Sequence, residues 1–177
     1  MILLVHGGLH GEIDSQRFWA DPGILEDLKA AGHSVLAPDQ LLNARSWAEE
    51  GDRLRPFIIG DSATVIAGSN GCSAALRLTL DHPDVVGKLA LCWPASPSAS
   101  ETSDTIRGVA DSELETITIP VAIVRSEPPN IHHQAQTVTA LKRLIPQALV
   151  LPGTPMAPQP EFADHRPAFM QTLLLVL

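Results

Sequence analysis

The sequence predicts an α/β protein with three layers, in which a mostly parallel sheet of about six strands lies between two layers of helices. Short, unbroken apolar runs recur along the chain, which is typical of strands that are buried on both faces. Segments with helical spacing of apolar residues, each roughly ten residues long, separate these runs. Strands that are joined through helices run parallel to one another.

The elements follow in regular order over residues 1–177, which we expect to form one domain. Apolar runs such as Ile-Leu-Leu-Val and Val-Ala-Ile-Val predict strands at residues 2–5, 33–37, 64–67, 88–92, 121–124 and 148–151. The segments between them predict helices at residues 23–31, 46–53, 71–81, 111–116, 135–144 and 161–175. A stretch rich in Pro, Ser and Ala predicts a loop at residues 94–103.

Charge and cysteine content exclude several classes of function. The chain has 12 Lys and Arg against 20 Asp and Glu, a net charge of −8, so we expect neither nucleic acid nor an anionic membrane as a partner. Cys72 and Cys92 are too few for a disulfide framework, and the chain opens without a basic leader segment. Its apolar runs are too short to span a bilayer. These features favour a cytoplasmic protein.

The most informative motif lies at residues 65–76, which read Val-Ile-Ala-Gly-Ser-Asn-Gly-Cys-Ser-Ala-Ala-Leu. An apolar strand passes through a turn of small residues into a helix, which is the pattern of a nucleophile elbow. Ser69 occupies the tip of this turn, with Ala67 and Gly71 two residues before and after it. Small residues there let the strand and the helix pass close together. Ser69 is therefore a candidate nucleophile, and a plain turn is the alternative.

A second motif supports the first, because the strand at residues 2–5 ends in His6-Gly7-Gly8. Together the two motifs resemble the α/β-hydrolase fold family. The chain is similar to short bacterial members that carry a Phe-Trp…Pro-Gly…Ala-Pro-Asp…Ser-Trp pattern, here Phe18, Trp19, Pro22, Gly23, Ala37, Pro38, Asp39, Ser46 and Trp47.

The resemblance implies an oxyanion hole built from backbone N–H groups. The donors would be Asn70 and Gly8, with Leu9 as the fallback for Gly8. The chain opens at the family's third strand, and residues 93–119 are too few for a cap domain. We therefore expect neither the usual N-terminal antiparallel strands nor a cap, and the sheet edge left open could support a homodimer.

The resemblance also implies a pocket for a small-molecule substrate and no cofactor or metal. We expect four residues around this pocket: His6 and Leu9 from the oxyanion loop, His10 beyond it, and Trp93 at the end of a neighbouring strand. A structural role is the alternative for His6, and core packing is the alternative for Trp93.

The catalytic base is harder to identify from the sequence. The family places its histidine after the last strand, where this chain has Met156, and a thioether cannot accept the serine's proton. His165 is the nearest substitute and is our predicted base, although a surface histidine at a helix start would read in the same way. His10 and one of the pair His132 and His133 remain alternatives.

The residue that orients the base is expected in the loop after the strand at 121–124. Glu127 is the carboxylate in that loop and is our predicted orienting residue, with Asp104 in reserve. Asn130 could stand in the aspartate's place, where it would orient an imidazole without stabilising imidazolium as a carboxylate does.

These residues predict a serine hydrolase that acts on a small carboxylic ester, thioester or lactone through an acyl-enzyme on Ser69. The absence of a histidine at position 156 supports an alternative, in which the hydrolase fold has lost its base and binds a ligand or partner. A lyase or cyclase that uses the oxyanion donors alone is the third alternative.

Overall fold

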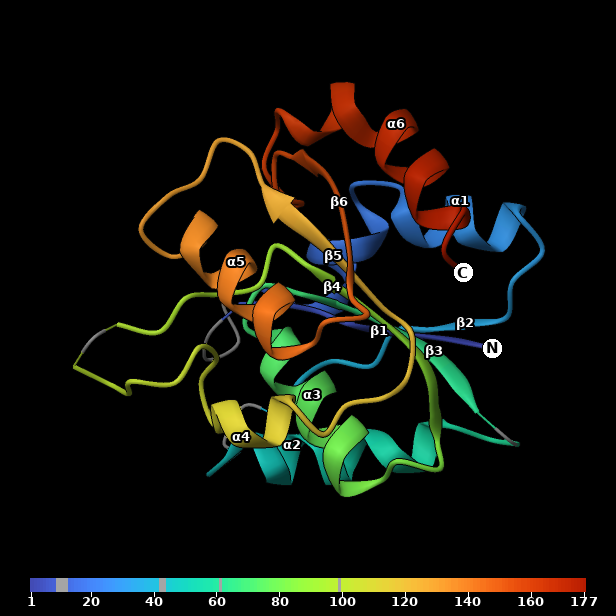
Figure 1. Ribbon diagram of the computed structural model, residues 1–177. Helices are drawn as coiled ribbons and strands as arrows, with labels where there is room; N and C mark the ends of the chain where they lie inside the picture. Colours follow the sequence, from blue (N-terminus) through green and yellow to red (C-terminus); the bar gives the residue numbers. More distant parts are fainter. Residues whose placement is uncertain (9–12, 42–43, 61, 99) are drawn as a thin grey trace.

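The computed structural model describes residues 1–177 except positions 9–12, 42–43, 61 and 99. Its centre is a parallel sheet in the order β2-β1-β3-β4-β5-β6 (Figure 1). The strands are β1 (Ile2–Val5), β2 (Val35–Leu36), β3 (Ala63–Gly68), β4 (Val86–Cys92), β5 (Val121–Ser126) and β6 (Leu149–Thr154). The predicted six-stranded parallel sheet is confirmed.

Helices cover both faces of the sheet (Figure 1). One face carries the π-helical turn η1 (Gln16–Ala20), α1 (Ile24–Ala30) and α6 (Phe162–Leu174). The other carries α2 (Trp47–Leu54), the 3-10 turn η2 (Arg55–Phe57), α3 (Gly71–Asp81), α4 (Asp111–Leu114) and α5 (Ala135–Leu144). Among the described helices, none combines the length and the apolar character that crossing a bilayer requires.

The strand residues alternate between two separate cores. Leu3 and Val65 face the core under α2, α3 and α5, whereas Leu4 and Ile66 face the core under α1 and α6. Both faces of the four inner strands are therefore largely buried, which explains why these strands read as unbroken apolar runs in the sequence.

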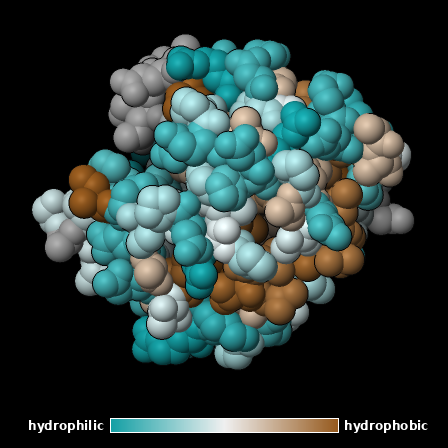
Figure 2. All heavy atoms as spheres, turned by 90° about the horizontal axis from the view of Figure 1, so that it is seen from above, coloured by the Kyte–Doolittle hydropathy of each residue, from teal (hydrophilic) through white to brown (hydrophobic). Residues whose placement is uncertain are grey.

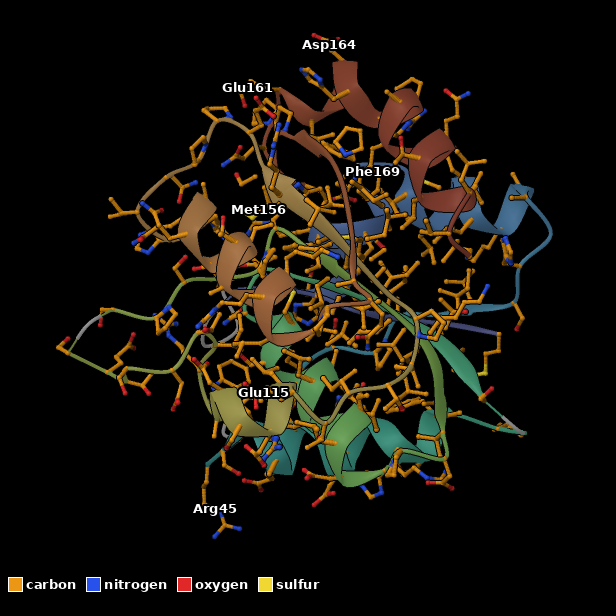
Figure 3. The ribbon with its side chains drawn as sticks, in the orientation of Figure 1. Arg45, Glu115, Met156, Glu161, Asp164 and Phe169 are labelled. Carbon is orange, nitrogen blue, oxygen red and sulfur yellow. The ribbon has the colours of Figure 1, made fainter. Side chains whose placement is uncertain are left out.

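The second core is unusually aromatic. Trp93 stacks on Phe169 at 5.2 Å between ring centroids, and Phe162 meets both rings edge to face. Phe18 and Trp19 complete the cluster from η1. Figure 3 marks Phe169 on α6, whose buried side chains cover this side of the sheet.

The observed elements differ from the expected ones mainly at their ends. The second strand is reduced to two residues, and η1 and η2 were not expected from the helical spacing. Between β4 and β5, the described part of the chain has α4 as its only helix, in agreement with the expected absence of a cap. The outer surface over α1 and α6 is mostly hydrophilic, with apolar side chains gathered along part of it (Figure 2).

Candidate active site

The turn after β3 has the backbone conformation that a nucleophile elbow requires. Ser69 has φ 52°, a left-handed value that is rare outside glycine, and α3 begins two residues later. The amide of Ser69 donates to the carbonyl of Cys92 at 2.9 Å, and its carbonyl accepts from the amide of Cys72 at 3.1 Å. A Cβ on Gly71 would collide with the carbonyl of His6, so this position requires glycine. The strained backbone is therefore held in place from both sides.

The Ser69 hydroxyl lies against His133. The distance from Ser69 Oγ to His133 Nε2 is 2.9 Å, within the range expected of a nucleophile and its base. His133 lies in the connection between β5 and α5, two residues before the helix begins, and is 8% exposed. The loop after β5, which is separated from β3 by β4 in the sheet, thus places an imidazole at the tip of the elbow.

Asn130 fixes the orientation of this imidazole. Its Oδ1 accepts hydrogen bonds from the backbone amides of His132 and His133, at 2.9 and 3.1 Å, and lies 3.1 Å from His133 Nδ1. Two amide donors already identify the facing atom as oxygen, so Nδ1 must carry a hydrogen and donate to it. In neutral imidazole the other nitrogen, Nε2, is then the acceptor that faces the Ser69 hydroxyl.

The surroundings of His133 favour its neutral form. Burial, followed by the neighbouring His132, lowers the pKa of His133 to about 4. An amide oxygen orients the ring but supplies no negative charge to offset this effect. The histidine is therefore neutral, and able to accept a proton, over the whole range from weakly acidic to alkaline pH.

The expected oxyanion donors lie beside this pair. Asn70 follows Ser69, and its side-chain Nδ2 donates to the carbonyl of Gly8 at 2.9 Å, which ties the two loops together. Gly8 has φ 104°, and a Cβ on Gly7 would stand 2.6 Å from the Cβ of Ser69. In the described part of the chain, the backbone N–H groups of Gly8 and Asn70 donate to no other group.

The other residues that we expect around the pocket are placed differently. Leu9 and His10 lie outside the described residues. His6 is 3% exposed; its Nε2 accepts from the amide of Gln40 at 2.9 Å, and the Gln40 side chain bonds its carbonyl. Trp93 is fully buried in the aromatic core and donates from Nε1 to Thr154 Oγ1. His6 and Trp93 therefore support the site from behind and do not line an open pocket.

The structure does not bring the predicted base and orienting residue to Ser69. His165 is exposed on α6 and lines a hollow of about 870 Å³ together with Glu127. Glu127 forms an ion pair with Arg125 at 3.1 Å, on the surface. The reason is the direction of the chain after β6, where Met156 packs against the aromatic core and α6 begins beyond it (Figure 3). His133 occupies the position beside the serine that we assigned to His165.

Sequence reasoning identified His133 only as one of several alternatives. The signal that could have singled it out is Asn130 three residues before it. An asparagine at that spacing, just ahead of a helix, forms a tight turn through its side-chain oxygen and can hold the histidine ring at the same time.

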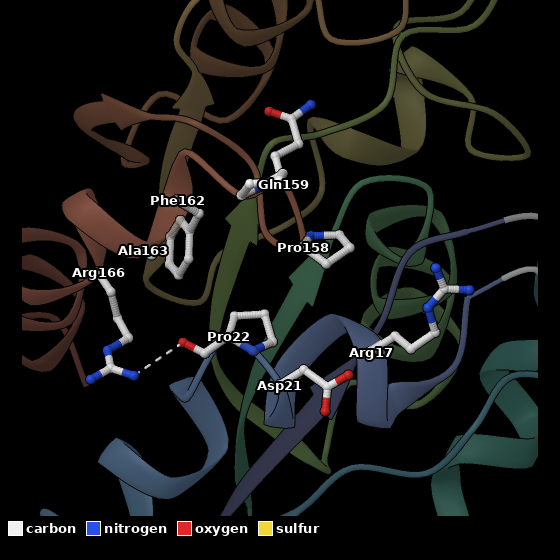
Figure 4. A pocket seen from close by; sticks show the side chains of 9 residues that line it. Arg17, Asp21, Pro22, Pro158, Gln159, Phe162, Ala163 and Arg166 are labelled. Carbon is white, nitrogen blue, oxygen red and sulfur yellow. Dashed lines mark hydrogen bonds between the residues drawn. The ribbon is translucent and has the colours of Figure 1, made fainter.

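A further hollow of about 490 Å³ lies between η1 and the start of α6 (Figure 4). Arg166 closes one side of it, donating to the carbonyl of Pro22 at 3.3 Å and pairing with Asp27 at 3.3 Å. Neither Ser69 nor His133 is among the described residues that line it. The described residues contain no group of three or more His, Cys, Asp or Glu side chains arranged to bind a metal.

Comparison with known proteins identifies the fold. No protein-family model matches the sequence, and no curated protein matches it. Among solved structures, an esterase from Thermogutta terrifontis is 13% identical with a TM-score of 0.74, over 98% of this chain and 88% of that one. A monoacylglycerol lipase from Paleococcus ferrophilus is 16% identical with a TM-score of 0.74, over 99% and 94%. An extracellular α/β-hydrolase from a Paenibacillus species is 10% identical with a TM-score of 0.73, over 99% and 98%. The chain has the α/β-hydrolase fold.

Proposed function

We propose that the protein is a serine hydrolase of small carboxylic esters, thioesters or lactones, with Ser69 as nucleophile, His133 as base and Asn130 as the orienting residue. The contact of 2.9 Å between Ser69 Oγ and His133 Nε2 carries this proposal. It is supported by the Asn130 oxygen, which leaves Nε2 as the acceptor nitrogen. Similar structures described as an esterase and a lipase point to the same class of reaction.

In the first half of the proposed reaction, Ser69 Oγ attacks the acyl carbon while its proton moves to His133 Nε2. The amides of Asn70 and Gly8 stabilise the oxyanion that forms, and such donors are each worth roughly 3 kcal/mol in the transition state. The imidazolium then gives its proton to the leaving oxygen or sulfur, and the acyl group remains on Ser69.

In the second half, His133 takes a proton from water, and the resulting hydroxide attacks the acyl-enzyme. Collapse of this second intermediate returns the proton to Ser69 Oγ and releases the carboxylic acid. No cofactor is needed, because each charge that develops meets a group of the chain itself.

The neutral orienting residue bears on the choice of substrate. Imidazolium beside an amide is less stable than imidazolium beside a carboxylate, so transfer of the Ser69 proton to His133 is less favourable. Esters and thioesters with acidic leaving groups depend least on that transfer. We therefore propose activated acyl compounds, and not amides, as substrates.

The test is covalent labelling with a fluorophosphonate probe, together with hydrolysis of p-nitrophenyl acetate. Wild type should be labelled, and Ser69→Ala and His133→Ala should lose activity by roughly 10³-fold or more. The matched control is His165→Ala, an exposed histidine on α6, which should behave like wild type. Loss of labelling in His165→Ala but not in His133→Ala would contradict the assignment of the base, and absence of labelling in folded wild type would favour a binding role.

A further inference from the structure

A short connecting segment links the two halves of the candidate site. After β4 the chain turns sharply at Trp93, whose φ is 52°, and continues through Ala95 to Ser96. The amide of Ala95 donates to the carbonyl of Ser69 at 3.3 Å. Residues 93–96 therefore begin in contact with the nucleophile turn.

The other end of this segment is bonded to the turn that carries His133. The amide of Ser96 donates to the carbonyl of His132 at 2.7 Å, and Ser96 Oγ accepts from the amide of Gln134 at 2.9 Å. These two bonds grip the backbone immediately before and immediately after His133. One residue thus holds both flanks of the candidate base, through its backbone amide on one side and its hydroxyl on the other.

A second hydroxyl completes the arrangement. Ser96 Oγ lies 2.7 Å from Thr137 Oγ1 in the first turn of α5, and the two residues are 5% and 8% exposed. Hydroxyl groups at this depth need partners, and each finds its partner in the other. The pair thereby anchors Ser96 to α5.

We propose that Ser96 and Thr137 are positioning residues, which hold His133 at hydrogen-bond distance from Ser69. The inference rests on the proposed function for its catalytic consequence, but the contact that it invokes is a property of the fold. Because the spacing of a nucleophile and its base must be held closely, a displacement of about 1 Å is expected to lower the rate by roughly 100-fold.

The experiment compares four variants by their rate of fluorophosphonate labelling. Ser96→Ala removes the acceptor for Gln134, and Thr137→Val removes one hydroxyl while keeping the shape of the side chain. Both should be labelled roughly 10- to 100-fold more slowly than wild type. Thr137→Ser restores the hydroxyl and should recover most of the rate.

The matched control is Thr79→Val. Thr79 is a threonine of similar burial whose hydroxyl bonds the carbonyl of Ala75 within α3, away from the His133 turn. It should be labelled at the wild-type rate. Wild-type rates in both Ser96→Ala and Thr137→Val, or an equal loss in Thr79→Val, would overturn the proposal.

A second readout separates this inference from the proposed function. Imidazole resonances followed by NMR report the titration of His133 in any folded variant, active or not. In wild type His133 should titrate near pH 4, and in Ser96→Ala and Thr137→Val the midpoint should move toward the ordinary value of 6.5 as water reaches the loosened ring. If wild type is not labelled but the two variants show these shifts, the proposed hydrolase function is wrong and the positioning role is supported. If His133 titrates at the same pH in wild type and in both variants, the positioning role is wrong.

Discussion

His133 is a histidine whose surroundings keep it neutral, because its ring is buried and its Nδ1 faces an amide oxygen. The base must be neutral to accept a proton, so the rate of probe labelling should stay constant from about pH 8 to about pH 5 and fall with a midpoint near pH 4. A histidine with the ordinary pKa of 6.5 would give a midpoint more than two pH units higher.

Folding must be followed in the same experiment by circular dichroism. His133 has a lower pKa in the folded chain than in the unfolded chain, so the unfolded chain binds its proton first as pH falls. The free energy of unfolding should therefore decrease from about pH 6.5 to about pH 4 and be unaffected by this group at higher pH. An acid limb that appears near pH 6.5 in a fully folded sample would contradict the proposed environment of His133.

The choice of asparagine at position 130 can be tested directly. In Asn130→Asp a carboxylate would face His133 Nδ1, and an opposite charge at this distance favours the imidazolium. We expect the acid midpoint of labelling to rise by roughly 1–3 pH units. Asn130→Ala, which removes the orienting oxygen, should lower the rate at all pH values. A midpoint that stays near 4 in the aspartate variant would show that Asn130 does not face the base in solution.

Gly7 gives a purely steric prediction. An added Cβ would lie 2.6 Å from Ser69 Cβ and 2.9 Å from the carbonyl of Gly68, so Gly7→Ala must push the nucleophile turn away. We expect the labelling rate to fall by roughly 100-fold. The control is Gly32→Ala, where no atom lies within 4 Å of the new Cβ but φ is 88°. That variant should lose about 1 kcal/mol of stability and keep its labelling rate.

At the scale of elements, α6 is attached to the sheet mainly through aromatic rings. Phe169 is 2% exposed and stacks on Trp93, so Phe169→Ala should lower the free energy of unfolding by about 3–5 kcal/mol. Gln171→Ala, an exposed change on the same helix, should alter it by less than about 0.5 kcal/mol. Urea denaturation monitored by tryptophan fluorescence provides the measurement, and equal stability of the two variants would contradict the packing role of α6.

The elements were predictable because their signals are local. An unbroken apolar run located β1 to the residue, and helical spacing of apolar residues did the same for α3. The small residues around Ser69 predicted the turn between β3 and α3. β2 could not be sized in this way, because its length is set by its register with β1, which extends over two residue pairs. The π-helical turn η1 has no simple periodic signature.

The proposed base was not predictable from the same signals, since the position of His133 beside Ser69 depends on where loops distant in sequence converge. Nothing in the residues around His165 indicates that the chain after β6 turns away from Ser69. Likewise, nothing local to His133 indicates that Ser96, 37 positions earlier, bonds to its flanks. The Ser69 turn is formed by one continuous segment, whereas the position of His133 beside it depends on how the whole sheet and its loops are assembled.

At the scale of the whole molecule, the two cysteines report on the two cores separately. Cys72 is buried in the core under α2, α3 and α5, and Cys92 in the aromatic core on the opposite face. Burial raises the pKa of both thiols, so neither should react with Ellman's reagent in the folded protein at pH 8. In increasing urea both should become reactive at one midpoint. Cys72→Ala and Cys92→Ala each leave one thiol as the reporter of one core. Different urea midpoints of thiol reactivity in these two variants would show that the two faces unfold independently.

The route of the chain through the candidate site has a consequence for how the protein could be modified. The proposed nucleophile, base, orienting amide and positioning residues all precede position 138, so β6 and α6 contribute none of the groups that the proposed reaction uses. The loop between them, which contains Met156, therefore supplies no group to the proposed reaction. A peptide tag or a recognition sequence grafted into that loop at its exposed residues 159–161 would therefore displace no group that the proposed reaction uses, which makes this loop a suitable place for an insertion.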